Sequence, residues 1–263
     1  MVSYPCMEDI KFSVSGVKKL LRNLKNYKTP GPDGIKTHVM KSLSSQHAPT
    51  VTMIYQQAYA VGDIPTDWRK ANVVPAYKKG SKHDPSNYLP ISLTCIACKL
   101  FEHIIASNIM KHANENNILY DLQHGFRERR SCETQLIEFT ADIISNMQQG
   151  HQTDTIILDF SKAFDKVSHS RLLYKLQHYG ITGKTNKVVS SFLSQLTQRV
   201  ALEGEHSYEG QVVSGVPQGS VLGPCLFLFY INDITEGLES TVRLFSDDTI
   251  LYLAITSPTD ATR

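Results

Sequence analysis

A short apolar run that ends in an acidic residue most constrains the fold of this 263-residue chain. The run Thr155-Ile156-Ile157-Leu158 leads directly into Asp159, and nearly ninety positions later Asp247 and Asp248 stand between two further apolar segments. The run predicts a buried strand, and the Asp-Asp pair predicts the tip of a tight hairpin. Because an unpaired carboxylate is costly to bury, we expect the strand end and the hairpin tip to lie side by side.

The segments around these carboxylates predict an α+β fold. In the second half, apolar patterns predict strands over 155–158, 198–202, 211–214, 242–245 and 250–253, and helices over 172–179 and 222–232. This order favours an antiparallel sheet with helices on one face. In the first half, the patterns predict helices over 16–26, 35–60, 97–109 and 136–147 and a strand over 68–77.

Composition excludes several classes of protein. Hydrophobic residues make up 41% of the chain, and the longest purely apolar run, Cys225–Ile231, is far shorter than the roughly 20 residues of a membrane span. The first residues lack the basic-then-apolar order of a signal peptide, and five unclustered cysteines fit free thiols in a reducing compartment. We therefore expect an intracellular protein rather than a membrane, collagen-like or disulfide-scaffold protein.

The net charge of +2 hides an asymmetry between the two halves. Residues 1–150 carry 18 basic and 13 acidic side chains, whereas residues 151–263 carry 9 and 12. A basic half followed by an acidic half suits a protein that grips a polyanion with one part and holds metal-binding carboxylates in the other.

Converging carboxylates point to divalent-metal chemistry. Mg²⁺ takes oxygen ligands and keeps substrate phosphates in its shell, and two such ions can clamp both oxygens of an in-line phosphoryl displacement. The turn-rich segment Ser214–Ser220, which leads into a helix, suits the same chemistry. The alternative is structural: Asp247-Asp248 is then a solvated turn, and Asp159 caps a turn or helix.

Six ordered motifs narrow the choice, and the similarity that they define extends over about nine tenths of the chain. They are Thr29–Ile35, Asn87–Leu93, Gln123–Arg127, Leu158–Asp165, Ser214–Pro224 and Phe245–Asp248. In this combination the chain resembles the reverse transcriptase domain of jockey-like non-LTR retrotransposons. The resemblance implies an RNA-directed DNA polymerase, in which a primer 3′-OH attacks the α-phosphate of a dNTP on an RNA template, with two Mg²⁺ ions as cofactors.

The resemblance also implies a right-hand polymerase architecture. Residues 1–66 would form an N-terminal helical extension, 67–153 the fingers, and 154–263 a palm with an antiparallel, ferredoxin-like sheet. Because the chain stops soon after the Asp-Asp hairpin, we expect the thumb to be missing. The working protein would act in the nucleus or the cytoplasm, although the sequence shows no targeting signal.

The resemblance assigns the acidic centre and the sugar contact. Asp159 and Asp247 would hold the two metal ions, Asp248 would support them, and the Phe160 carbonyl would complete a shell. Phe164 would pack under the sugar and favour dNTP over rNTP, although its position also suits a plain core aromatic.

Further residues are assigned to nucleotide and nucleic acid. Gln218 and Gly219 would contact the incoming nucleotide and let the backbone approach the template. Lys78 and Lys79 would bind the triphosphate. Contacts to template or primer phosphates are expected from Lys82, Arg127, Arg129 and Arg130. For these basic residues a solvated loop remains an alternative.

Two substitutions and one isolated motif leave other functions open. Relatives commonly carry Arg where this chain has Leu89, and Leu offers no donor or charge to a triphosphate. Ser246 replaces a usual Ala. Cys95 and Cys98 form a lone CxxC, which does not favour zinc. A truncated, inactive remnant that only binds nucleic acid is therefore the main alternative, and a two-metal nuclease or cyclase is a further one.

Overall fold

Two separate sheets carry the strands of the computed structural model, which describes residues 4–257 and 259–260. The smaller sheet is antiparallel, with β8 in the middle; its strands are β3 (Gln152–Leu158), β8 (Asp248–Ile255) and β7 (Thr241–Phe245). Helix α5 (Cys132–Gln148) packs against β3 and β7. It begins at a capping box, in which Ser131 and Thr134 each accept the other's backbone N–H.

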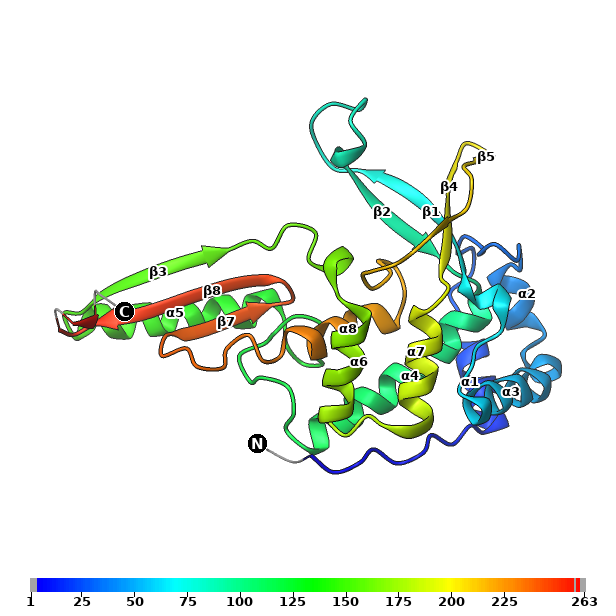
Figure 1. Cartoon of the computed structure of the whole chain (residues 1–263), viewed down its shortest axis with the longest axis horizontal. Helices are drawn as coiled ribbons and strands as arrows, with labels where there is room; N and C mark the ends of the chain where they lie inside the picture. The colour runs from blue at the N-terminus through cyan, green and yellow to red at the C-terminus, as the bar shows by residue number, and fades with distance from the viewer. Residues whose placement is uncertain (1–3, 258, 261–263) are drawn as a thin grey trace.

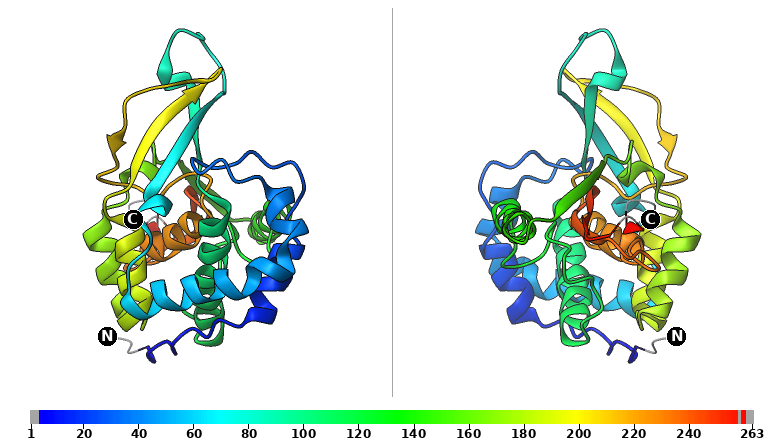
Figure 2. Two further views of the ribbon diagram at one scale, coloured as in Figure 1. Left: turned by 90° about the vertical axis from the view of Figure 1, so that its right-hand side faces the viewer. Right: turned by 90° about the vertical axis from the view of Figure 1, so that its left-hand side faces the viewer.

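The larger sheet has five strands and stands above the helices as a separate lobe (Figure 2). Its strands are β1 (Lys70–Tyr77), β2 (Tyr88–Leu93), β4 (Thr197–Leu202), β5 (Glu205–His206) and β6 (Gly210–Gln211). β1 pairs antiparallel with β2 and parallel with β4, a strand more than 120 residues away in the sequence.

Helices fill the space between and beside the sheets. In Figure 1, α1, α2 and α3 lie at one end of the molecule, the three-stranded sheet and α5 lie at the other, and the remaining helices lie between them. The helices besides α5 are α1 (Val14–Arg22), α2 (Thr37–Ser42), α3 (Ser44–Val61), α4 (Ile96–Glu115), α6 (His169–His178), α7 (Gly183–Leu193) and α8 (Leu222–Ile231). None of the helices in the described part of the chain is both long and apolar enough to cross a membrane.

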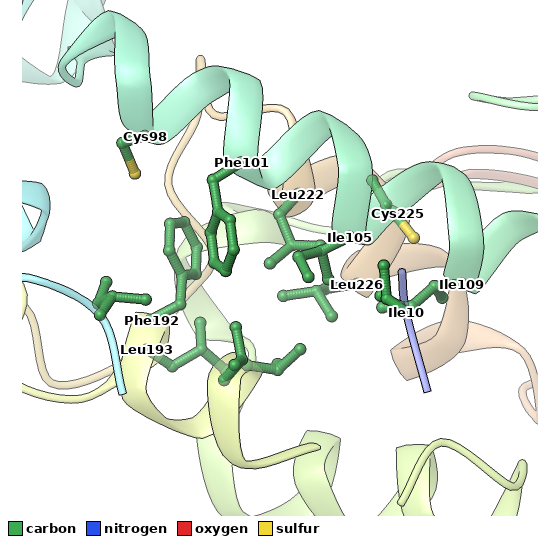
Figure 3. Close-up of a cluster of buried hydrophobic side chains, with 14 of the residues drawn as sticks. Ile10, Cys98, Phe101, Ile105, Ile109, Phe192, Leu193, Leu222, Cys225 and Leu226 are labelled. Carbon is green, nitrogen blue, oxygen red and sulfur yellow. The ribbon is translucent and has the colours of Figure 1, made fainter. Parts of the chain in front are cut away.

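The hydrophobic core is centred on α4 and α8. Figure 3 shows side chains of α4, α7 and α8 gathered in one cluster, with Phe101, Phe192 and Leu226 among them. Tyr55 of α3 is fully buried and donates a hydrogen bond to the Ala97 carbonyl of α4 at 2.7 Å. The N-terminal helices are thereby joined to the core that supports the centre of the molecule.

The structure confirms the predicted α+β class, and most predicted elements lie within a few residues of their expected bounds. The segment over 35–60 is a correction, because the chain breaks at Leu43 and forms α2 and α3 instead of one helix. No residue range was predicted for helix α7, although its Val188, Val189 and Phe192 recur at helical spacing and are buried.

Two further predictions about the second half were wrong. The strand over 155–158 is exposed, because within the described residues β3 is an edge strand that pairs with β8 alone. Its Ile157 side chain is 75% exposed. The strand over 198–202 lies in the larger sheet, where β4 pairs with β1, and not in the sheet that carries the aspartates. Of the strand over 211–214, only Gln211 is in a strand, at the end of the two-residue β6, which pairs with β4. Residues 1–3, 258 and 261–263, parts of the expected extension and palm, lie outside the described residues.

Candidate active site

The strand register brings the three aspartates to one place. β3 and β8 pair Leu158 with Thr249, and β7 and β8 pair Phe245 with Asp248. Asp159 directly follows β3 and therefore emerges beside Asp248, while Asp247 occupies the turn between β7 and β8. Acidic residues 88 positions apart in the sequence thus meet at one end of the small sheet.

The electrostatics of Asp248 show that these carboxylates influence one another. Burial raises the pKa of Asp248 above its ordinary value, and the negative charges of Asp247 and Asp159 raise it further. Within residues 4–257 and 259–260, no three His, Cys, Asp or Glu side chains are grouped closely enough to hold a metal ion. The three aspartates nevertheless offer only oxygen ligands, the type that Mg²⁺ prefers. A bound divalent cation would reduce the repulsion of Asp248 by the negative charges of Asp247 and Asp159.

A cleft of about 920 Å³ connects Asp159 and Asp247, but not Asp248, to the larger sheet. Its walls come from β1 and β2, the turn between them, β4, and the segment after β3. Seven of the thirteen residues predicted for the site line it: Lys78, Lys82, Asp159, Phe160, Phe164, Gln218 and Asp247. The lining therefore brings the carboxylates of Asp159 and Asp247 into one cleft with the lysines of the β1–β2 turn, a combination that suits a metal-bound phosphate.

The basic wall is a well-supported turn between β1 and β2. The Tyr77 hydroxyl donates to the Gly80 carbonyl at 2.6 Å, and the Tyr88 hydroxyl donates to the Lys82 carbonyl at 2.9 Å. The Lys82 ammonium lies 5.7 Å from the centre of the Tyr77 ring. Lys79 is exposed on the same turn but is absent from the cleft lining.

Phe164 belongs both to the core and to the cleft. Its ring stacks on Phe227 of α8, with centroids 4.3 Å apart, and meets Phe126 edge-on at 6.1 Å. Phe164 therefore packs in the core and also lines the cleft, while the sugar contact expected from the resemblance stays a prediction.

The loop before α8 is docked on β2. The Gln218 carbonyl accepts a hydrogen bond from the Ser92 backbone N–H at 2.7 Å, and the Gln218 amide donates to Asp165 at 3.4 Å. Gly219 has φ of 98°, and a Cβ there would lie 2.8 Å from the Ser92 carbonyl oxygen. Position 219 thus requires glycine because β2 lies too close for a side chain. Gly219 itself does not line the cleft.

The three predicted arginines lie outside the cleft, on the loop before α5. Arg127 donates to the Tyr120 carbonyl at 2.9 Å, and Arg130 donates to the Asp121 carbonyl and faces its carboxylate at 3.9 Å. Arg129 is exposed with φ of 62°. Two of the three cations therefore stabilise their own loop.

Comparison with known proteins agrees with this arrangement. Residues 77–261, well over half of the chain, match the family described as "Reverse transcriptase (RNA-dependent DNA polymerase)". The chain belongs to the reverse transcriptase family. The matched region contains every site residue predicted from the sequence.

Relatives of the chain include proteins of Drosophila melanogaster mobile elements. The chain is 30% identical over 89% of its length to "RNA-directed DNA polymerase from mobile element jockey", of which it covers 26%. It is 27% identical over 95% of its length to "Probable RNA-directed DNA polymerase from transposon BS" and covers 28% of that protein. It is 28% identical over 90% of its length to "Probable RNA-directed DNA polymerase from transposon X-element" and covers 27% of that protein. The resemblance to jockey-like elements is confirmed, and the chain spans about a quarter of these relatives.

Sequence reasoning missed a buried carboxylate that supports the loop before α8. Glu102 of α4 is 1% exposed and accepts hydrogen bonds from the backbone N–H groups of Val221 and Leu222, at 2.8 and 3.0 Å. Burial raises its pKa, although these two donors and the Cys98 thiol act in the opposite direction. Glu102 thereby caps α8 immediately after Gln218 and Gly219. The sequence could have indicated this carboxylate, because Glu102 is an acidic residue next to the apolar positions, such as Phe101, that predict the buried face of the helix.

A second missed group joins the β7–β8 hairpin to α5. Arg243 of β7 is 5% exposed and pairs with Glu138 and Asp142 at 2.6 Å each, and it donates to the Tyr252 hydroxyl at 2.7 Å. Burial acts to raise the pKa of Asp142, but hydrogen bonds from Arg243 and Tyr252 hold it below its ordinary value. The network anchors both strands of the hairpin to one helix.

Proposed function

We propose that this chain is the polymerase core of a non-LTR retrotransposon reverse transcriptase, which extends a DNA primer with dNTPs on an RNA template. In this proposal residues 1–66 are an N-terminal extension, 67–153 the fingers and 154–263 the palm. The observation that carries it is the cleft that Asp159 and Asp247 line together with Lys78 and Lys82. The same site would operate in the nucleus or the cytoplasm, where such templates occur.

The chain's own residues divide the work within the cleft. Asp159 and Asp247 would hold two Mg²⁺ ions, with Asp248 and the Phe160 carbonyl as further oxygen donors. When bound, the ions would lower the charge barrier at the reacting phosphate and at both oxygens of the displacement. Lys78 would neutralise the triphosphate. Lys82, expected at the template or primer, lines the same cleft and would assist it, whereas Lys79 lies on the same turn outside the cleft lining.

Sugar and nucleic-acid contacts complete the proposal. Phe164 is held in the cleft by stacking on Phe227, so its ring could exclude a 2′-hydroxyl group from the sugar position. Gln218 would contact the incoming nucleotide, and Gly219 would let this loop stay close to β2 while it faces the template. Arg129, with the exposed edges of Arg127 and Arg130, would contact phosphates of the template or primer.

The proposal is tested by primer extension with Mg²⁺ and dNTPs on an RNA template. We expect the wild-type chain to extend the primer and Asp247→Ala to lose at least about a thousandfold of the rate, because metal contacts contribute several kcal/mol. Asp154→Ala is the matched control, since Asp154 is an exposed aspartate of β3 that hydrogen-bonds Gln152. Wild-type extension no faster than that of Asp247→Ala would contradict the proposal.

One observation favours an alternative. Leu89 lines the cleft, where a cationic side chain would serve a triphosphate better. A chain that retains the basic turn but no longer catalyses would bind an RNA–DNA hybrid without extending it. Filter binding of the same primer–template, measured beside the extension assay, separates this remnant from an active polymerase.

A further inference from the structure

The side chain of Gln123 grips the turn that carries Asp247. Its Oε1 accepts hydrogen bonds from the backbone N–H of Ser246 at 2.9 Å and of Gly125 at 2.7 Å. Its Nε2 donates to the Ser246 carbonyl at 3.1 Å. Gln123 is 3% exposed, so these bonds are shielded from water.

The surrounding segment holds this side chain in place. The Leu244 N–H donates to the Leu122 carbonyl at 3.0 Å, and the His124 N–H donates to the Leu244 carbonyl at 2.8 Å. Residues 122–124 therefore form a short parallel bridge to β7. A Cβ on Gly125 would lie 2.1 Å from the Ser246 nitrogen, which shows how closely the two backbones approach.

The bonded groups belong to the two peptide units on either side of Ser246. The Ser246 N–H is part of the 245–246 peptide, and the Ser246 carbonyl is part of the 246–247 peptide. Ser246 has φ of 60°, a conformation that is unfavourable for a residue with a side chain. The Gln123 carboxamide thus fixes both peptide planes of a strained turn. The plane of the 246–247 peptide in turn sets the direction of the Asp247 side chain.

We infer that Gln123 is a positioning residue for Asp247. The inference rests on the proposed function, because it assigns Asp247 to metal binding. Gln123 does not touch the reacting groups in this role; it holds the carboxylate where a divalent cation can use it. Partners that orient a metal ligand in this way typically contribute about 10–100-fold in metal affinity or activity.

The test compares three variants of the full chain. Gln123→Met keeps the length of the side chain and removes all three hydrogen bonds. Gln123→Glu keeps the acceptor for the two N–H groups but, when ionised, has no donor for the Ser246 carbonyl. Gln135→Met is the matched control, because Gln135 is 5% exposed and its Oε1 has no hydrogen-bond partner within the described residues.

Three measurements are made on each protein: hydrogen exchange of the peptide containing Ser246, the Mn²⁺ dissociation constant, and primer extension. We expect faster exchange in Gln123→Met, slow exchange in Gln123→Glu, and Mn²⁺ binding weakened at least about tenfold in both. Gln135→Met should resemble the wild type. Circular dichroism identifies any variant that does not fold, and the isosteric Gln123→Glu then carries the test.

The outcomes separate this inference from the proposed function. Unchanged exchange and unchanged Mn²⁺ affinity in Gln123→Met would overturn the role of Gln123, as would an equal loss in Gln135→Met. If exchange and Mn²⁺ affinity respond as expected while the wild-type chain extends no primer, the positioning role stands and the polymerase proposal falls.

Discussion

Leu158 lies directly opposite Thr249 in the antiparallel pairing of β3 and β8. This register decides which side chains reach the end of the sheet, because a shift by one residue would exchange the two faces of a strand. With Leu158 and Thr249 aligned, Asp159 lies beside Asp248. The negative charge of Asp159 accordingly raises the pKa of Asp248. The register of one strand pair therefore controls whether the acidic side of the cleft exists.

A cation in place of Leu89 should improve nucleotide use. Leu89 lies opposite Ala76 in the β1–β2 pairing and lines the cleft. We expect Leu89→Arg to lower the KM for dNTP by about tenfold, since a charge-assisted hydrogen bond contributes about 1.5–3 kcal/mol. Leu89→Met is the uncharged control. Steady-state kinetics that show the same KM for both variants would contradict this role.

Removal of the Phe164 ring should relax the choice of sugar. Phe164→Ala opens space in the cleft, so we expect kcat/KM for an rNTP to rise at least about tenfold relative to that for a dNTP. The lost stacking on Phe227 should also cost about 2–3 kcal/mol of unfolding free energy, because Phe164 is only half-buried.

Phe139→Ala provides the comparison for Phe164. Phe139 of α5 meets Tyr252 edge-on at 5.3 Å and does not line the cleft. It should lower stability without changing the sugar preference. Equal preferences in Phe164→Ala and Phe139→Ala would show that Phe164 is a core aromatic and nothing more.

Loss of Arg243 should destabilise the sheet that carries the hairpin. Arg243→Met leaves Glu138 and Asp142 without their cation, and breaking a buried pair typically costs about 3–5 kcal/mol. Because these carboxylates are 46% and 43% exposed, we expect a smaller loss of about 2–3 kcal/mol, measured by urea unfolding. Glu138→Gln should cost less than about 1 kcal/mol. A loss of less than about 1 kcal/mol in Arg243→Met as well would indicate that the network contributes little.

The pH dependence of stability should reveal the buried carboxyl of Glu102. Burial raises its pKa above the ordinary 4.5, so the folded state binds the proton more tightly than the unfolded state does. Its contribution to stability is therefore fully present below pH 4.5 and is lost as the pH rises through the folded pKa. Glu102→Gln does not titrate and should lack this loss.

Urea unfolding at pH 5 and pH 8 checks the prediction for Glu102. The unfolding free energy of the wild type minus that of Glu102→Gln should decrease between the two values. Glu115→Gln controls for removal of an exposed acidic charge from the same helix. An equal difference at both pH values would mean that Glu102 is ionised throughout this range.

Local chemistry along the chain was enough to predict most elements of this protein. The 222–232 prediction differs from α8 by one residue, because an uninterrupted apolar segment after a glycine-rich turn leaves few alternatives. The hairpin with Asp247 at its tip was equally accessible, since strands and turns depend on neighbouring residues. The order of the six motifs then allowed the roles of the acidic residues and the family to be predicted.

Contacts between distant segments settled the remainder. The exposure of Ile157 depends on which elements cover β3, and the place of β4 depends on β1, whose sequence lies more than 120 residues away. Gln123 and Glu102 each bind backbone groups about 120 residues further along the chain. No local pattern encodes such pairs, because their free energy arises only when folding excludes water from both partners at once.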